Sequence, residues 1–197
     1  MRIAIFCLVA SALLTPATRA QANPGVPVFE VTPVESKVNF EVKASVAIQG
    51  KFDIWKATLT FVSTDVSTGV LDIEIQADSV DTGSGMKNGK LKGKDFFDVK
   101  NNPLITFKST KILQTGPDAF EVDGNFTIRG VTKPEKLTLT VTGAGTGSGT
   151  IQGTMAFDRK QFGMNSGIPF IKIADRVEVS VNLQAKRVSG PPVALTR

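Results

Sequence analysis

Apolar and polar residues alternate in many short segments of the chain. The clearest of these segments lie at residues 38–42, 59–61, 71–77, 105–107, 120–122, 126–128, 137–141, 155–157 and 177–183. A period of two gives a strand one apolar and one polar face, which is typical of antiparallel sheets that cover a core. The pattern therefore predicts an all-β domain of about eight to ten antiparallel strands, closed as a barrel or packed as a sandwich. The polar faces carry charges, whereas membrane barrels need an apolar outer band, so we expect that the chain does not span a membrane.

The alternation breaks at residues 87–99, where Leu91, Phe96 and Phe97 stand among lysines and glycines. Adjacent residues cannot share one face of a strand. We therefore expect a short helical turn at residues 95–99 that packs both phenylalanines into one end of the apolar interior as a plug. A surface turn that caps the core is the alternative. Asn102-Pro103 favours extended backbone, and a strand is predicted to begin at Leu104.

The first residues are typical of a secretory signal peptide. Arg2 precedes an apolar segment at residues 3–14, which is too short for a bilayer span of about 20 residues, and small residues allow cleavage after Ala20 or Ala22. An N-terminal anchor is the alternative. We expect a signal peptide at residues 1–22, a β-barrel domain at 23–187 and a flexible C-terminal tail at 188–197. Cys7 is the single cysteine, so the mature protein would fold in an oxidising compartment without disulfides.

The residue inventory excludes several kinds of site. The chain has no His and no Tyr, and its cysteine lies in the signal peptide, so nucleophile systems and metal sites that use His or Cys are absent. Cleavage removes Arg2 and Arg19 and no acidic residue, which lowers the formal net charge from +5 to +3. This charge is spread along the chain without a basic block, so we expect no nucleic-acid partner. The glycine-rich segments 83–90 and 143–149 depart from nucleotide-binding spacings and are interpreted as flexible loops. We expect no enzyme activity, no cofactor and no metal.

Four motifs occur in a characteristic order along the chain. They are G-K-F at 50–52; D-T-G at 81–83 with Leu91, D-F-F-D-V at 95–99 and P-L-I-T-F-K-S-T at 103–110; G-N-F-T-I-R-G-V-T-K-P at 124–134; and D-R-K-Q-F-G at 158–163. Together they resemble the signatures of YceI-like proteins over about residues 29–185. The resemblance implies a lipocalin-like, eight-stranded antiparallel β-barrel in the bacterial periplasm, with an elongated apolar cavity for a polyisoprenoid or another long amphipathic lipid. The chain departs from the family pattern at Lys43 and at residues 87–91, where many members have His or an Arg-Asp-x-His-Leu run, so those polar contacts are not transferred.

The candidate ligand site combines apolar side chains with nearby cations. The apolar lining is predicted to be Phe40, Val42, Phe52, Trp55, Leu59, Phe61, Phe96, Phe97, Phe107, Phe126, Phe157 and Phe162. The candidates for contact with a phosphate or quinone headgroup are Lys87, Lys90, Lys94 and Arg159. The expected ligand is a polyisoprenoid, an isoprenoid quinone or a fatty-acid-like lipid. The sequence leaves both a monomer and a homodimer open. For each lining residue plain core packing is an equal alternative, and the competing function is a secreted interaction module with a filled core and no lipid.

Overall fold

The computed structural model describes residues 25–45, 47–143, 146–167 and 173–195. In this part of the chain the strands are β1 (Val28–Ala44), β2 (Ile48–Phe52), β3 (Trp55–Thr60), β4 (Val70–Gln76), β5 (Val80–Asp81), β6 (Leu104–Gln114), β7 (Ala119–Ile128), β8 (Val131–Thr142), β9 (Ser148–Asp158) and β10 (Ile173–Ser189). The α-helix α1 spans Gly85–Lys92, and short 3₁₀ turns lie at Val66–Thr68 (η1), Ala77–Ser79 (η2) and Arg159–Phe162 (η3).

These strands form one closed antiparallel barrel. From β6 to β10 each strand pairs with the next one in the chain, β6 also pairs with β4, and β10 closes the sheet on β1 from Val28↔Ser189 to Ala44↔Ile173. β2 and β3 are two halves of one barrel strand, because both pair with β1. Likewise β4 pairs with β3 and β5 pairs with β2, with η2 as the break between them. The ten segments therefore make eight strands, and the predicted eight-stranded barrel is confirmed.

Side-chain alternation explains which face of each strand turns inward. Along β4, Leu71, Ile73 and Ile75 are buried, while Asp72 and Glu74 between them are partly exposed. The same pattern holds along β6, β7, β9 and β10, so the apolar faces line the barrel interior. Burial of each such side chain contributes about 1.5–3 kcal/mol of hydrophobic free energy, and these faces together drive the closure of the sheet.

The helix lies earlier in the chain than the sequence predicted. Residues 94–97 form turns, and Asp98 has a left-handed backbone (φ 49°), which stops a helix at this point. The glycine-rich segment 83–90, interpreted above as a flexible loop, instead contributes most of α1, and that interpretation is wrong. The reason is a set of side-chain bonds at the start of the helix. Asp81 accepts from the Gly83 amide (2.9 Å), and Asn88 Oδ1 accepts from the Thr82 amide (2.8 Å).

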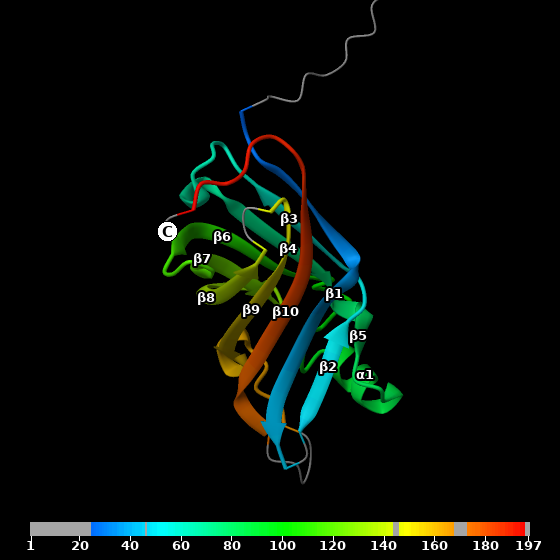
Figure 1. The fold of residues 1–197 in the computed structure, drawn as a ribbon. Coiled ribbons are helices and arrows are strands. Elements are labelled where there is room, and N and C mark those ends of the chain that lie inside the picture. Colours follow the sequence, from blue (N-terminus) through cyan, green and yellow to red (C-terminus); the bar gives the residue numbers. More distant parts are fainter. Residues whose placement is uncertain (1–24, 46, 144–145, 168–172, 196–197) are drawn as a thin grey trace, which may run out of the picture.

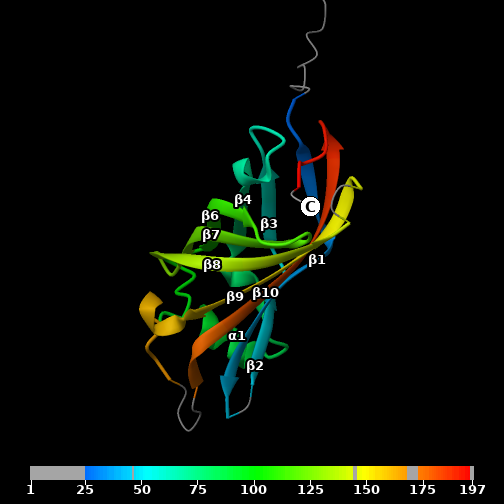
Figure 2. The ribbon, with the colours of Figure 1, turned by 60° about the vertical axis from the view of Figure 1, so that its left-hand side comes forward.

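The ends of the barrel differ in what covers them. We call the end that holds the first residues of β1 and the last of β10 the upper end, and the end that holds α1 the lower end (Figure 1). After β10 the chain turns back across the upper end, in Figure 1 and again in the rotated view of Figure 2. The Ala194 amide donates to the Thr64 carbonyl there (2.7 Å). The sequence predicted a flexible tail at 188–197; in the structure β10 extends to Ser189, and Pro192, Val193 and Leu195 after it border the barrel interior. In the described residues no helix has the length and apolar character needed to cross a bilayer.

Candidate functional site

An apolar cavity of about 90 Å³ occupies the lower part of the barrel, and we call it the lower cavity. Seven of the predicted lining residues border it: Phe40, Val42, Phe52, Phe96, Phe97, Phe126 and Phe157. They come from β1, β2, β7, β9 and the turn after α1, so several strands contribute to the wall. The helix adds Leu91 from the same end.

Phe96 and Phe97 are both buried, which explains the adjacent pair in the sequence. The Phe97 ring lies 5.8 Å from the Phe52 ring, and Phe52 in turn lies 5.6 Å from Phe40. Phe96 packs under α1, with Lys90 Nζ 5.7 Å from the centre of its ring. The turn therefore closes the lower cavity with one ring directed into the barrel and the other held beneath the helix.

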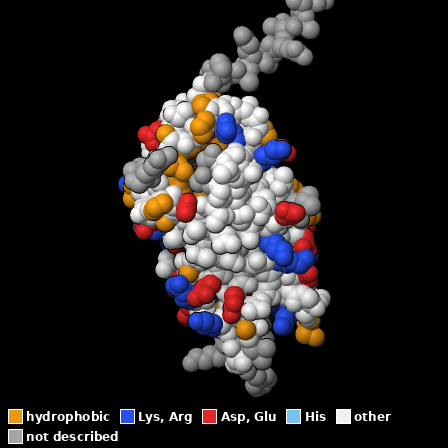
Figure 3. Space-filling view, in the orientation of Figure 1, with side chains coloured by type: hydrophobic (Ala, Val, Ile, Leu, Met, Phe, Trp, Pro, Cys, Tyr) orange, Lys and Arg blue, Asp and Glu red, His pale blue; other side chains and the backbone are white. Residues whose placement is uncertain are grey.

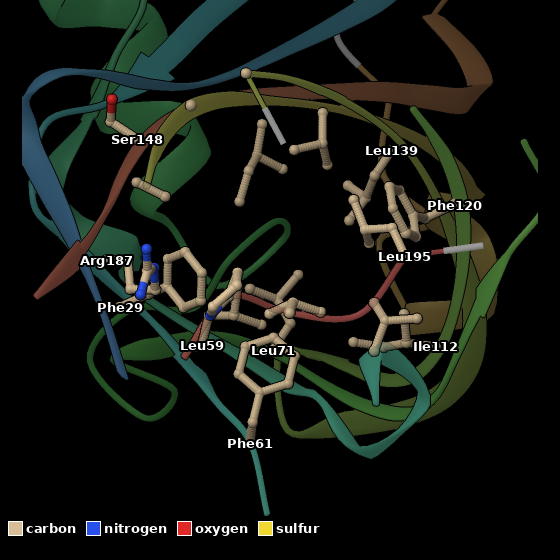
Figure 4. A pocket seen from close by; sticks show the side chains of 18 of the residues that line it. Phe29, Leu59, Phe61, Leu71, Ile112, Phe120, Leu139, Ser148, Arg187 and Leu195 are labelled. Carbon is tan, nitrogen blue, oxygen red and sulfur yellow. The ribbon is translucent and has the colours of Figure 1, made fainter. Parts of the chain in front are cut away.

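A second apolar cavity of about 120 Å³ occupies the upper part of the barrel, and we call it the upper cavity. The predicted lining residues Leu59 and Phe61 border it, together with Phe120 and Leu139. Figure 4 shows their side chains arranged around an open centre, with Leu195 of the C-terminal segment among them. Hydrophobic side chains also gather on the outer surface beside this segment (Figure 3).

A packed layer of side chains separates the two cavities. Its members are buried and line neither cavity. We call this set the central layer; it consists of Ile73, Phe107, Val122, Leu137, Met155, Val181 and Leu183. All of them except Leu137 lie on their strands between residues of the upper cavity and residues of the lower cavity. Phe107 was predicted to line the ligand site and belongs instead to this layer.

Two further predicted lining residues border neither cavity. Trp55 is half-buried at the start of β3. Phe162 is fully buried and packs on Phe126 and Phe157, with ring centres 5.5 Å and 5.3 Å apart. The cluster supports the wall of the lower cavity from behind, so Phe162 positions the residues that border the cavity.

Two of the predicted headgroup lysines, Lys87 and Lys90, border the lower cavity from α1. Lys90 forms an exposed ion pair with Asp95 (2.8 Å). The hydrogen bond and charge of Lys90 lower the pKa of the Asp95 carboxyl below its ordinary value. Lys94 does not border the cavity, and its backbone carbonyl accepts a hydrogen bond from Arg129 (3.0 Å). The margin of the lower cavity therefore carries two lysines, of which one is paired.

Arg159, the fourth predicted headgroup residue, is 6% exposed and reaches the lower cavity from η3. Its guanidinium donates to the carbonyls of Ala174 (3.0 Å), Ser166 (3.0 Å) and Met164, and it pairs with Asp175 (3.2 Å). These bonds engage the donors of the side chain, so Arg159 holds the segment after β9 against β10.

Arg129 is a residue that the sequence analysis did not single out. It adopts a left-handed backbone (φ 55°) in the turn between β7 and β8. Its guanidinium donates to the carbonyls of Lys94 and Gly163 and so joins the turn after α1 to the segment after η3. The sequence did contain a signal for this role, because Arg129 lies inside the motif at 124–134 and a guanidinium can donate to two carbonyls at once. The upper cavity is also bordered by Pro192, Val193 and Leu195. Apolar and polar residues do not alternate in this segment, so the sequence pattern did not identify these residues.

The described residues contain no group of three or more His, Cys, Asp or Glu side chains placed to hold a metal ion. The arrangement instead offers two apolar spaces, with Lys87 and Lys90 at the margin of the lower cavity and Arg187 at the margin of the upper cavity. Such a surface can bind hydrocarbon by burial and an anion by charge.

Comparisons with known proteins agree with this architecture. The chain is 35% identical over 98 residues to the UPF0312 protein of Yersinia pestis (strain Pestoides F), and 33% identical over 98 residues to that of Pseudomonas aeruginosa (strain LESB58). The match covers 50% of this chain and about half the length of each of these relatives (50% and 51%).

Three solved structures share the fold. Burkholderia cenocepacia BcnA is 29% identical with a TM-score of 0.71, over 79% of this chain and 99% of that one. The Campylobacter jejuni YCEI protein is 23% identical with a TM-score of 0.60, over 71% and 85%. A polyisoprenoid binding domain from Saccharophagus degradans is 16% identical with a TM-score of 0.63, over 82% and 99%. Residues 29–185 match the YceI-like domain, and the chain belongs to that family.

Proposed function

We propose that this protein is a periplasmic binding or carrier protein that holds a polyisoprenoid or another long amphipathic lipid inside its barrel. The observation that carries the proposal is the lower cavity, an apolar space of about 90 Å³ with Lys87 and Lys90 at its margin. The apolar tail enters this cavity, and an anionic or quinone headgroup stays beside α1. Each buried prenyl unit gains roughly 4 kcal/mol, at about 0.8 per methylene.

Binding without bond chemistry is consistent with the residues present. The cavity walls carry apolar side chains, and Arg159 is engaged by carbonyls and by Asp175. The polyisoprenoid binding domain from Saccharophagus degradans shares the fold, which supports a hydrocarbon ligand of the same class. Association costs roughly 4–15 kcal/mol, so burial of a few prenyl units is sufficient for stable retention.

Native mass spectrometry of the protein tests this function. The protein is expressed with residues 1–22 and purified without detergent from the periplasmic fraction, and bound molecules are released by organic extraction. We expect a hydrophobic molecule in stoichiometric amount and a chain that begins after Ala20 or Ala22. The same spectrum reports whether the protein is a monomer or a homodimer. Absence of any hydrophobic molecule, after exposure of the protein to lipid extract, contradicts the proposal.

A double variant connects the ligand to the lower cavity. Phe96→Asp with Phe97→Asp places two carboxylates at the closure of the cavity, and we expect loss of lipid retention. Met86→Asp is the matched control, because Met86 is an apolar residue of α1 with 87% of its surface exposed. The milder pair Phe96→Leu and Phe97→Leu keeps the core apolar in case the first variant unfolds. Retention equal to that of the control in both pairs contradicts the proposed site.

The central layer favours one competing function, a secreted interaction module with a filled core. Close packing at the middle of the barrel is what such a module requires, since ordinary interiors are filled to the density of organic crystals. The two functions differ in the extraction experiment, because a filled-core module releases no lipid. The apolar space beside the lysines is the reason that we prefer the binding protein.

A further inference from the structure

The central layer occupies the same height on strands from around the barrel. On β4, Leu71 borders the upper cavity, Ile73 borders neither, and Ile75 borders the lower cavity. The same order, from the upper cavity through the layer to the lower cavity, is found for Ile112, Phe107 and Ile105 on β6, for Phe120, Val122 and Phe126 on β7, and for Ala185, Leu183 and Val179 on β10. No described residue borders both cavities.

Two glycines allow this layer to pack closely. A Cβ atom on Gly124 would lie 2.5 Å from Phe107 Cζ, so the Phe107 ring rests directly on the backbone of β7. A Cβ atom on Gly153 would lie 2.6 Å from a methyl of Val181 and 3.3 Å from one of Leu137. The layer is therefore filled by large side chains that use the space left by the glycines, and a hydrocarbon can cross it only by displacing them.

Each cavity alone accommodates a short apolar segment. Their volumes are about 120 Å³ above the layer and 90 Å³ below it. A cavity of roughly 150 Å³ lined by Leu, Ile and Phe admits benzene. A long tail thus fits this barrel only when it passes the central layer and uses both spaces.

We propose that the central layer makes the barrel selective for tails long enough to reach the upper cavity, an inference that rests on the proposed function. A tail inside the lower cavity gains about fourfold in affinity for each added carbon. A tail that reaches the layer gains nothing further, because its added carbons displace packed side chains. A tail that crosses the layer gains again, because it enters the empty upper cavity.

A series of n-alkyl monophosphates from about four to about eighteen carbons tests the inference by titration calorimetry, since each carbon adds a fixed increment of burial. We expect affinity to rise, to stay level over a range of intermediate lengths, and to rise a second time. Methyl NMR identifies the space that each probe occupies. Intermediate probes should shift the methyl signal of Ile105 in the lower cavity, and longer probes should also shift those of Ile73 in the layer and Ile112 in the upper cavity.

Variants test whether the central layer causes the level range, which is the range of intermediate chain lengths over which affinity stays constant. Phe107→Leu and, as a second variant, Val181→Ala remove atoms from the layer, and we expect at least a fourfold gain in affinity for probes of intermediate length. Val80→Ala is the matched control for Val181→Ala, because Val80 is buried on β5 and borders neither cavity, and it should keep the level range. A uniform rise with length in the wild type, or equal effects of Val181→Ala and Val80→Ala, overturns the inference and leaves the proposed function in place. Failure of every probe to bind overturns both.

Discussion

Replacement of Gly124 by Ala is the sharpest test of how tightly the centre of the barrel is packed. The new methyl group would lie 2.5 Å from Phe107 Cζ and 2.8 Å from the carbonyl oxygen of Lys108. The phenyl ring can tilt away, but the carbonyl belongs to the backbone of β6, which pairs with β7 at this point. The two strands must therefore separate locally to admit the methyl group.

The size of the effect follows from this geometry. Overpacking of a core costs typically about 1–3 kcal/mol, and we expect Gly124→Ala to lie at the upper limit because a backbone atom is in the way. Gly153→Ala meets only the ends of side chains, at 2.6 Å for Val181 and 2.7 Å for Leu139, and should cost about 1–2 kcal/mol. For a domain of this size each kcal/mol corresponds to about 2–4 °C, so Gly124→Ala should lower Tm by about 6–12 °C.

Urea unfolding followed by Trp fluorescence measures these differences. Gly89→Ala is the control, because the added methyl has no atom within 4 Å and lies inside α1, where Ala stabilises by about 0.5–1 kcal/mol relative to Gly. Addition of Phe107→Leu to Gly124→Ala should recover part of the loss, as a coupled pair does. Wild-type stability of Gly124→Ala would refute a close-packed centre, and with it the physical basis for selection by tail length.

Three further outcomes follow from the lower end of the barrel. Arg129→Lys should destabilise the protein by about 1.5–3 kcal/mol in urea unfolding, because a lysine cannot hold two separate carbonyls as the guanidinium does. Asp81→Asn should lower Tm at neutral pH. The Gly83 amide and the Asn88 side chain lower the pKa of Asp81 in the folded protein. The ionised Asp81 carboxylate therefore stabilises the folded protein at pH values above the pKa that Asp81 has in the unfolded chain. This stabilisation is lost as the pH falls through the pKa that Asp81 has in the folded protein. The Tm difference from wild type should therefore vanish in acid, and a constant difference from pH 7 to about pH 2 would contradict this cause. Asp95→Asn releases Lys90 from its ion pair and should raise the affinity for an alkyl monophosphate by up to about fivefold in calorimetry; an unchanged affinity would place the headgroup elsewhere.

The alternation of side chains was sufficient to predict the strands and their buried faces, because a period of two directly specifies which face of a strand is buried. The alternation left a barrel and a sandwich open, and the resemblance to YceI-like proteins favoured the barrel. It was insufficient for α1. Gly85 and Gly89 are poor helix formers, and the helix depends on bonds from Asp81 and Asn88 that no local propensity contains. The adjacent pair Phe96-Phe97 correctly marked the closure of the lower end, although the helical turn expected there is absent.

The residues that border each cavity could not be predicted from the sequence, for a different reason. Phe107 and Phe126 are both buried and face inward on neighbouring strands, where they are direct partners in the sheet. Yet Phe126 borders the lower cavity and Phe107 fills the central layer. The difference depends on the space above Gly124, which the Phe107 ring occupies. Alternation specifies the direction of a side chain but not the volume that its neighbours leave open.

The motifs of the family converge on the lower end, where they mainly support the scaffold. D-T-G at 81–83 starts α1, Arg129 joins the turn after α1 to the segment after η3, and Arg159 holds the segment after β9 against β10. Side chains that limit tail length, such as Val181 in the central layer, lie in part outside these motifs. Two members of the family that share every motif are therefore expected to share the closed lower end while differing in the length of tail that they hold. Substitutions at residues of the central layer that lie outside the motifs, such as Val181, are the changes that should convert one preference into the other.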